Sequence, residues 1–104
     1  MKITNVKTSL MGVARQSWLF VTIETDEGIS GIGEASLEGK EKTVETAIHE
    51  FARYLIGRDP ARITHHWQAM YCHGFRRGGV VLNSAISGLE QALWDIKGKT
   101  LCVP

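Results

Sequence analysis

The chain has 104 residues, of which 43% are hydrophobic and 22% charged, and its formal net charge is +1. These values are ordinary for one soluble globular domain, and the mixed charges form no basic stripe for binding nucleic acid. No apolar run is long enough to span a membrane and the N-terminus lacks a signal-peptide core, so we expect a cytoplasmic protein. Cys72 and Cys102 are isolated thiols without metal-ligand spacing or a disulfide framework.

The first third of the chain has the pattern of an antiparallel sheet. The segment "WLFVTIET" places Leu19, Val21 and Ile23 on one face, which predicts a half-buried strand. A "DEG" turn leads to "ISGIGEA", whose Gly31 and Gly33 indicate a close backbone approach or a bulge. The segment "KITNVKTSL" predicts a first strand, and "MGVARQS" predicts a loop between the first two strands.

Two amphipathic helices are predicted next. Residues 42–56 repeat apolar side chains at three- and four-residue steps, and Gly57 suits the position just after a helix. Asp59 and Pro60 then predict a second helix, with Asp59 as the N-cap and Pro60 at the first helical position. The apolar face expected for this helix consists of Ile63, Trp67, Met70 and Tyr71.

A third helix is predicted over residues 81–97. Ser87 and Gly88 within it are poor helix formers, which indicates that another element packs closely against them. The order of the elements predicts an α+β fold, namely a three-stranded antiparallel β-meander followed by a three-helix bundle.

Two motifs suggest a cofactor but lack the pattern that such a site requires. "GISGIGEAS" has Ser36 where a dinucleotide-binding loop needs glycine, and the segment has the pattern of a strand. His65, His66 and His73 together with Cys72 suggest zinc, but no recognised ligand spacing is present. Surface or packing roles therefore explain these histidines better than metal binding.

Lys97 and Lys99 form a Lys-x-Lys pair, an arrangement that can present an acid and a base to one substrate. On a strand both side chains would point the same way, but on a helix they diverge by about 200°. Because the pair ends a predicted helix, we expect it to complement the helix dipole, with Asp95 and Lys99 forming an ion pair. Spacing alone indicates no active site within this chain.

The segment "SAISGLEQALWDIKGKTLCVP" resembles the signature of the mandelate racemase/muconate lactonizing enzyme family of the enolase superfamily. The resemblance extends over the whole chain, through "MKIT", "TDEGI", "GIGEA", "LIGRDP" and "GFRRGG". Within the family, "YLIGRDPARI" and "WQAMY" are most similar to acid-sugar dehydratases of the galactonate dehydratase type. Cys102 departs from the pattern, because the family usually has glycine there.

The resemblance implies an enolase N-terminal domain-like cap on a two-part enzyme. Residues 1–98 would form the capping domain, and residues 99–104 would begin the linker to a C-terminal TIM-type barrel that this chain does not contain. In the family the barrel binds Mg²⁺ and removes the proton α to a carboxylate, and the metal stabilises the enediolate. We therefore expect neither catalytic residues nor a metal in this chain, which alone should be inactive. Family members are usually homo-oligomers.

What the resemblance carries to this chain is the cap over the barrel mouth, made from loops at residues 12–17 and 36–39. Such lids exclude water and influence specificity. Arg76 and Arg77 could reach the substrate, the barrel or a neighbouring subunit. The candidates for contact with a sugar-acid substrate are Arg15, Gln16, Ser36 and Glu38.

Other functions stay open at this stage. The chain could be the cap of a racemase or cycloisomerase, because the residues that distinguish these reactions lie in the barrel. It could also be a free-standing interaction module, which would have a polar surface where a cap would present an apolar patch.

Overall fold

The sheet of this domain contains three antiparallel strands. The computed structural model describes residues 1–13, 16–72 and 77–104. The strands, in the spatial order in which they pair, are β1 (Ile3–Val13), β2 (Gln16–Thr25) and β3 (Ser30–Glu34). Gly28 takes a φ of 80° in the turn between β2 and β3, a conformation that glycine adopts without a steric penalty.

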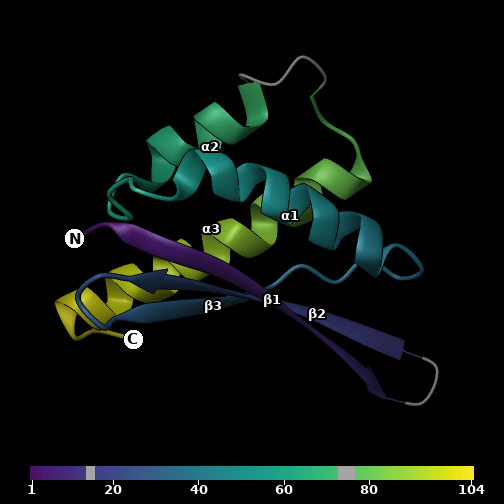
Figure 1. The fold of residues 1–104 in the computed structure, drawn as a ribbon, viewed down its shortest axis with the longest axis horizontal. Helices are drawn as coiled ribbons and strands as arrows, with labels where there is room; N and C mark the ends of the chain where they lie inside the picture. The colour runs from purple at the N-terminus through teal and green to yellow at the C-terminus, as the bar shows by residue number, and fades with distance from the viewer. Residues whose placement is uncertain (14–15, 73–76) are drawn as a thin grey trace.

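Three helices follow the sheet, and they cover one of its faces (Figure 1). They are α1 (Glu41–Leu55), α2 (Ile63–Cys72) and α3 (Val80–Leu101). Helices α1 and α3 pack directly on the sheet, whereas α2 lies on their outer side. The predicted α+β class is therefore confirmed. No helix in the described part of the chain is long and apolar enough to cross a membrane.

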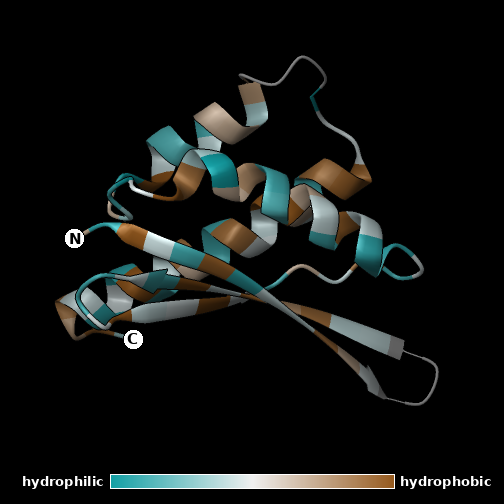
Figure 2. Ribbon diagram, viewed as in Figure 1, coloured by the Kyte–Doolittle hydropathy of each residue, from teal (hydrophilic) through white to brown (hydrophobic). Residues whose placement is uncertain are grey.

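The core lies between the sheet and the helices. Leu19, Val21 and Ile23 are fully buried on the inner face of β2, as their alternation predicted. Apolar and polar residues alternate along β1 and β2 in Figure 2. The helices supply the other half of the core, with fully or almost fully buried side chains at Val44, Ile48, Leu55, Leu89, Leu93 and Ile96.

The loop predicted from "MGVARQS" is wrong for most of its length. Strand β1 continues to Val13 and β2 begins at Gln16, and these two residues are paired. Met11 pairs with Trp18 and Gly12 with Ser17, so the hairpin is longer than expected. Continued pairing satisfies backbone groups that a loop would leave to water, and this outweighs the polar composition of the segment.

The predicted start of the second helix is also wrong. Asp59 accepts the backbone N–H of Ala61 at 2.9 Å in a local turn, and α2 begins only at Ile63. Asp59 and Pro60 therefore belong to the turn before the helix, because an aspartate can stabilise a turn with the same hydrogen bond that it uses as an N-cap. Trp67 is 38% exposed, contrary to the expected apolar face. The buried face consists of Ile63, His66, Ala69 and Met70.

Helix α3 ends at Leu101, later than the expected Lys97. Its last turn is closed by two backbone hydrogen bonds, from Val103 N–H to the Gly98 carbonyl (3.0 Å) and from Cys102 N–H to the Lys99 carbonyl (3.3 Å). This is the Schellman arrangement, in which the residue after the helix is usually glycine with a left-handed backbone. Here Cys102 occupies that position with a φ of 56°.

The backbones of β3 and α3 approach each other at glycine residues. A Cβ atom at Gly31 would overlap the Ala92 carbonyl oxygen, and one at Gly33 would overlap the Gly88 carbonyl oxygen. On the helix side, a Cβ at Gly88 would lie 2.5 Å from the Ala35 Cβ. The close approach inferred from Gly31, Gly33 and Gly88 is therefore confirmed.

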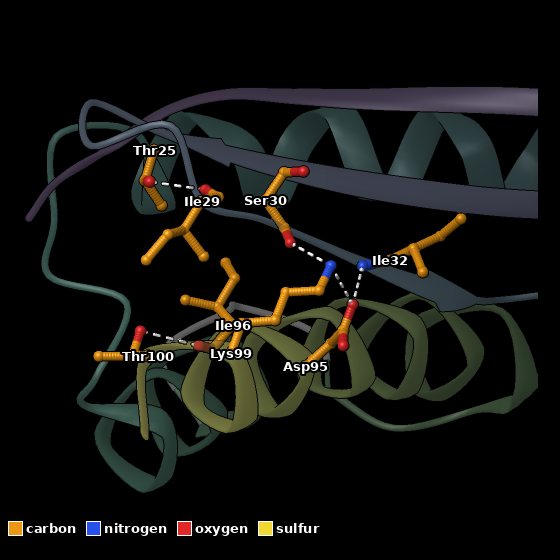
Figure 3. Close-up of polar contacts among 8 residues, drawn as sticks. All are labelled: Thr25, Ile29, Ser30, Ile32, Asp95, Ile96, Lys99 and Thr100. Atoms are coloured by element: carbon orange, nitrogen blue, oxygen red, sulfur yellow. Dashed lines mark hydrogen bonds and ion pairs between the residues drawn. The ribbon is translucent and has the colours of Figure 1, made fainter. Parts of the chain in front are cut away.

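Because the helix lies so close, its side chains reach the free edge of β3 (Figure 3). Asp95 Oδ2 accepts the Ile32 N–H at 3.0 Å, and Gln91 Oε1 accepts the Glu34 N–H at 3.1 Å. Lys99 Nζ donates to the Ser30 carbonyl at 2.7 Å and forms the expected ion pair with Asp95 at 3.1 Å. Four residues of helix rise about 6 Å and two residues of strand about 6.7 Å, so successive contacts stay in register.

The close approach predicts a large effect of one methyl group. Replacing Gly33 with Ala should lower the free energy of unfolding by about 2–3 kcal/mol, because neither backbone can yield without loss of the edge hydrogen bonds. Gly12→Ala is the matched control, since a Cβ there meets no atom within 4 Å and the expected change is at most about 0.5 kcal/mol. Urea unfolding of both variants measures the difference. Equal stability of the two variants would contradict the steric argument.

The edge contacts also predict a dependence of stability on pH. The Ile32 N–H and, to a smaller extent, the Lys99 ammonium hold the pKa of the Asp95 carboxyl below its ordinary value. A lowered folded-state pKa adds stability above the unfolded pKa, near 4, and this stability is lost as pH falls through the folded value. Asp95→Asn should therefore reduce stability at pH 7 and flatten the loss of stability below pH ~4 in urea titrations. Glu50→Gln, an exposed substitution on α1, is the control and should change the free energy of unfolding at pH 7 by less than about 0.5 kcal/mol.

Candidate functional site

The candidate site lies at the end of the molecule where the β1–β2 hairpin extends past the helices, near the start of α1 (Figure 1). Here the chain forms a shallow pocket of about 160 Å³ between the hairpin and the segment that connects β3 to α1. The lining residues are Ser17, Trp18, Ser36, Glu38 and Glu41.

One side of this pocket is formed where the chain leaves β3 and the sheet. Phe20 and Glu34 form the last pair between β2 and β3, and Ala35 N–H still donates to the Leu19 carbonyl at 2.9 Å. The Leu19 N–H then donates to the Ser36 Oγ at 3.0 Å. The serine hydroxyl therefore replaces the next backbone partner and ties the departing segment to β2.

The segment after Ser36 is a tight turn that leads into α1. Lys40 N–H donates to the Leu37 carbonyl at 2.9 Å, and Gly39 N–H donates to Glu41 Oε1 at 3.3 Å. Glu41 is the first residue of α1, where a carboxylate complements the helix dipole. The side chain of Glu38, by contrast, is exposed at the rim of the pocket.

The chemistry of the pocket suits recognition of hydroxyl groups. Its lining has two carboxylates and two hydroxyls, which are hydrogen-bond partners for the hydroxyl groups of a polyol. Trp18 adds an apolar surface that is 38% exposed. Among the described residues that line the pocket there is no lysine, arginine, histidine or cysteine. The described side chains therefore offer contacts mainly for hydroxyl groups.

The structure brings together two of the four predicted substrate contacts. Ser36 and Glu38 line the same pocket. Gln16 begins β2 at the end of the hairpin, and Arg15 lies outside the described residues. The substrate role of all four residues stays a prediction.

Sequence reasoning did not single out three residues of the pocket, Ser17, Trp18 and Glu41. Ser17 lies within the loop range expected from the family, but the continuation of the hairpin was not foreseen. For Glu41 the sequence does contain a signal of its position, since an acidic residue at the start of a helical pattern favours the first turn of the helix.

The other motifs take structural positions. Lys97 Nζ lies 5.0 Å from the centre of the Trp94 ring, whereas Lys99 contacts the edge of β3, so the two amines diverge as the helical geometry predicted. Arg77 is exposed and Arg76 lies outside the described residues.

His66 is a packing residue, 1% exposed. Its Nε2 lies 2.6 Å from the Asp59 carbonyl, to which it can only donate, and in the neutral imidazole Nδ1 then accepts from the Tyr54 hydroxyl at 2.9 Å. His73 falls outside the described residues. Within residues 1–13, 16–72 and 77–104, no three or more His, Cys, Asp or Glu side chains are grouped so that they could hold a metal ion.

The chain is similar to known proteins over its whole length. Residues 1–104 match the family described as the mandelate racemase/muconate lactonizing enzyme N-terminal domain. The chain belongs to this family. The resemblance of the third-helix segment and of the glycine motifs is thereby confirmed over the whole domain.

Similar proteins share the fold and are much longer. D-galactonate dehydratases of Xanthomonas euvesicatoria pv. vesicatoria (strain 85-10) and Xanthomonas campestris pv. campestris (strain B100) are each 57% identical over 104 residues, covering 100% of this chain and 26% of their own length. The chain thus spans about a quarter of the relatives that it matches.

Solved structures of longer proteins share the fold of this domain. A Mesorhizobium loti protein superposes with a TM-score of 0.93 at 43% identity, covering 97% of this chain and 28% of its own. An enolase from Pantoea ananatis with bound D-gluconate and Mg superposes with a TM-score of 0.90 at 45% identity, covering 96% of this chain and 25% of its own.

The hydrogen bond from Leu19 to Ser36 predicts which hydroxyl in the pocket is structural. Ser36→Ala leaves the Leu19 N–H without its partner and should lower the free energy of unfolding by about 1 kcal/mol. Ser17→Ala removes a hydroxyl from the same pocket and should change stability by less than about 0.5 kcal/mol. Chemical denaturation distinguishes the two, and a larger loss for the Ser17 variant would contradict the assignment.

Proposed function

We propose that this chain is the capping domain of a Mg²⁺-dependent sugar-acid dehydratase, a carbon–oxygen lyase whose catalytic barrel follows the cap in the same polypeptide. The observation that carries the proposal is the 57% identity, over the whole chain, to D-galactonate dehydratases of which it spans 26%. The Pantoea ananatis structure, with its bound D-gluconate and Mg, supports a sugar acid as the substrate class and Mg²⁺ as the metal.

The reaction assigned to the complete protein begins with removal of the proton α to the substrate carboxylate by a base of the barrel. Loss of the β-hydroxyl as water then gives an enol, which tautomerises to a 2-keto-3-deoxy acid. Mg²⁺, when bound, supplies charge stabilisation at the carboxylate. Among the described residues no three or more His, Cys, Asp or Glu side chains are grouped to hold a metal ion, and the proposed ligands lie in the remaining polypeptide.

The part of this chain in the reaction is to close the site. Ser17 and Trp18 of the hairpin line one pocket with the turn after β3, at the end of the molecule where the hairpin projects, and this arrangement suits a lid over a barrel mouth. At this surface Glu38 and Ser36 can bind substrate hydroxyls. Arg15 and Gln16, which directly precede Ser17 in the sequence, carry a guanidinium and an amide, groups that can bind the substrate carboxylate. A closed lid also excludes water from the reacting atoms.

The test uses the complete protein, with the residues that its gene encodes after Pro104. With Mg²⁺ it should convert D-galactonate or D-gluconate into the corresponding 2-keto-3-deoxy acid, detected by mass spectrometry, and EDTA should abolish the reaction. The 104-residue chain alone should give no product. Racemisation of a carboxylic acid without loss of water would instead favour the racemase function that the family name includes, and no reaction with any sugar acid would overturn the proposal.

One variant tests the cap directly in this assay. Glu38→Ala should raise the KM for the sugar acid by about tenfold, the effect of losing one hydrogen bond to a charged group, with little change in the fold. Glu50→Ala is the matched control, because Glu50 is also an exposed carboxylate and lies on α1, outside the lining of the pocket. A KM that is unchanged in the Glu38 variant would remove this residue from the substrate contacts.

A further inference from the structure

The outer surface of α3 near its C-terminus carries two large apolar side chains that the core does not use. Trp94 is 51% exposed and Leu101 is 59% exposed. They lie seven residues apart, and two helical turns bring them to the same side of the helix. We call this surface the Trp94–Leu101 face. The buried side of α3 is a different stripe, formed by Ala85, Ile86, Leu89, Ala92, Leu93 and Ile96.

The Trp94 ring is held in place although it is exposed. Its indole N–H donates to Glu90 Oε1 at 3.4 Å, and the Lys97 ammonium lies 5.0 Å from the ring centre. A side chain that is already ordered loses less entropy when a partner covers it. Tryptophan is also among the residues most often found at the centre of protein interfaces.

A hollow adjoins this face. It measures about 280 Å³ and lies between the end of α3, the N-terminal residue and the turn before α2. Leu101 belongs both to the Trp94–Leu101 face and to the wall of the hollow, so the two form one surface. The apolar part of the wall consists of Met1, Pro60, Ala61, Ile96 and Leu101.

The backbone of the domain ends beside this surface. The two hydrogen bonds that close α3 turn the chain at Cys102 and Val103, and Pro104 cannot extend the helix. Any polypeptide continuing from Pro104 therefore leaves beside Leu101. This exit is at the opposite end of the molecule from the hairpin that forms the candidate substrate site (Figure 1).

We propose that the polypeptide following Pro104, in a protein of the relatives' length, packs on the Trp94–Leu101 face and fills the adjoining hollow with apolar side chains. About three quarters of each relative lies outside the region that matches this chain, so a large covalently attached partner is expected. Attachment gives this partner a high effective concentration, which favours it over a second copy of the chain. Glu90 and Lys97 flank the Trp94 ring and Asp59 lines the hollow, so charges of both signs border the surface and favour no strongly charged partner.

The inference rests on the two-domain arrangement of the proposed function but not on its chemistry. It is tested by hydroxyl-radical footprinting of the complete protein, with oxidation of each tryptophan measured by mass spectrometry. In this domain Trp94 is more exposed than Trp67 on α2, at 51% against 38%, so Trp67 is the internal control. If the following polypeptide covers the face, Trp94 should be oxidised at most about a third as fast as Trp67 at every protein concentration.

Two results would overturn the inference. Oxidation of Trp94 as fast as or faster than that of Trp67 would contradict the inference, because an uncovered Trp94 is the more exposed of the two. Protection of Trp94 that increases with protein concentration would assign the face to contacts between copies. Neither footprinting result depends on enzymatic activity. A protein that dehydrates no sugar acid but in which Trp94 is protected would contradict the proposed function and leave this inference intact.

Discussion

The structure depends on the short distance between β3 and α3. Glycine at positions 31 and 33 removes the side chains that would otherwise stand between strand and helix, and Gly88 does the same from the helix side. A sheet and a helix usually pack through layers of side chains. Here the carbonyl groups of α3 face the strand directly, so the separation is set by backbone atoms, which are much less adaptable than side chains.

The short distance between β3 and α3 influences the structure at both ends of the domain. Toward the C-terminus it lets Gln91, Asp95 and Lys99 reach the strand edge, which fixes the rotation of α3 and thereby leaves Trp94 on its outer side. Toward the hairpin it carries Ala35 against the helix, and the next residue, Ser36, bonds to β2. The contact between strand and helix therefore fixes the position at which the turn that contains Glu38 begins.

Local sequence patterns were sufficient for much of this fold. The alternation at Leu19, Val21 and Ile23 identified the inner face of the sheet, and Gly88 indicated close packing because it interrupts an otherwise good helix. The patterns failed where two structures use the same residue types. Asp59 stabilises a turn rather than a helix start, and polar residues near Ser17 belong to a hairpin rather than a loop.

The candidate site was less accessible from sequence. Ser36 and Glu38 were named because of a family resemblance, and only tertiary structure places them beside Trp18 and Glu41. The reason is physical: a pocket formed between the end of a hairpin and a distant turn has no periodicity along the chain. The contacts of the apolar residues on the outside of α3 could not be predicted either. A helical pattern separates the buried stripe from the other residues of the helix, but it does not show what those other residues contact.

The edge of β3 has one more consequence. A strand at the border of a sheet normally exposes N–H and C=O groups that can recruit a strand from another molecule. In this domain the helix side chains already occupy such groups at Ser30, Ile32 and Glu34, and at the opposite border Ile3 exchanges two backbone hydrogen bonds with the turn at Gly57 and Arg58. The β3 border of this domain therefore has few free backbone groups with which a strand of another molecule could pair.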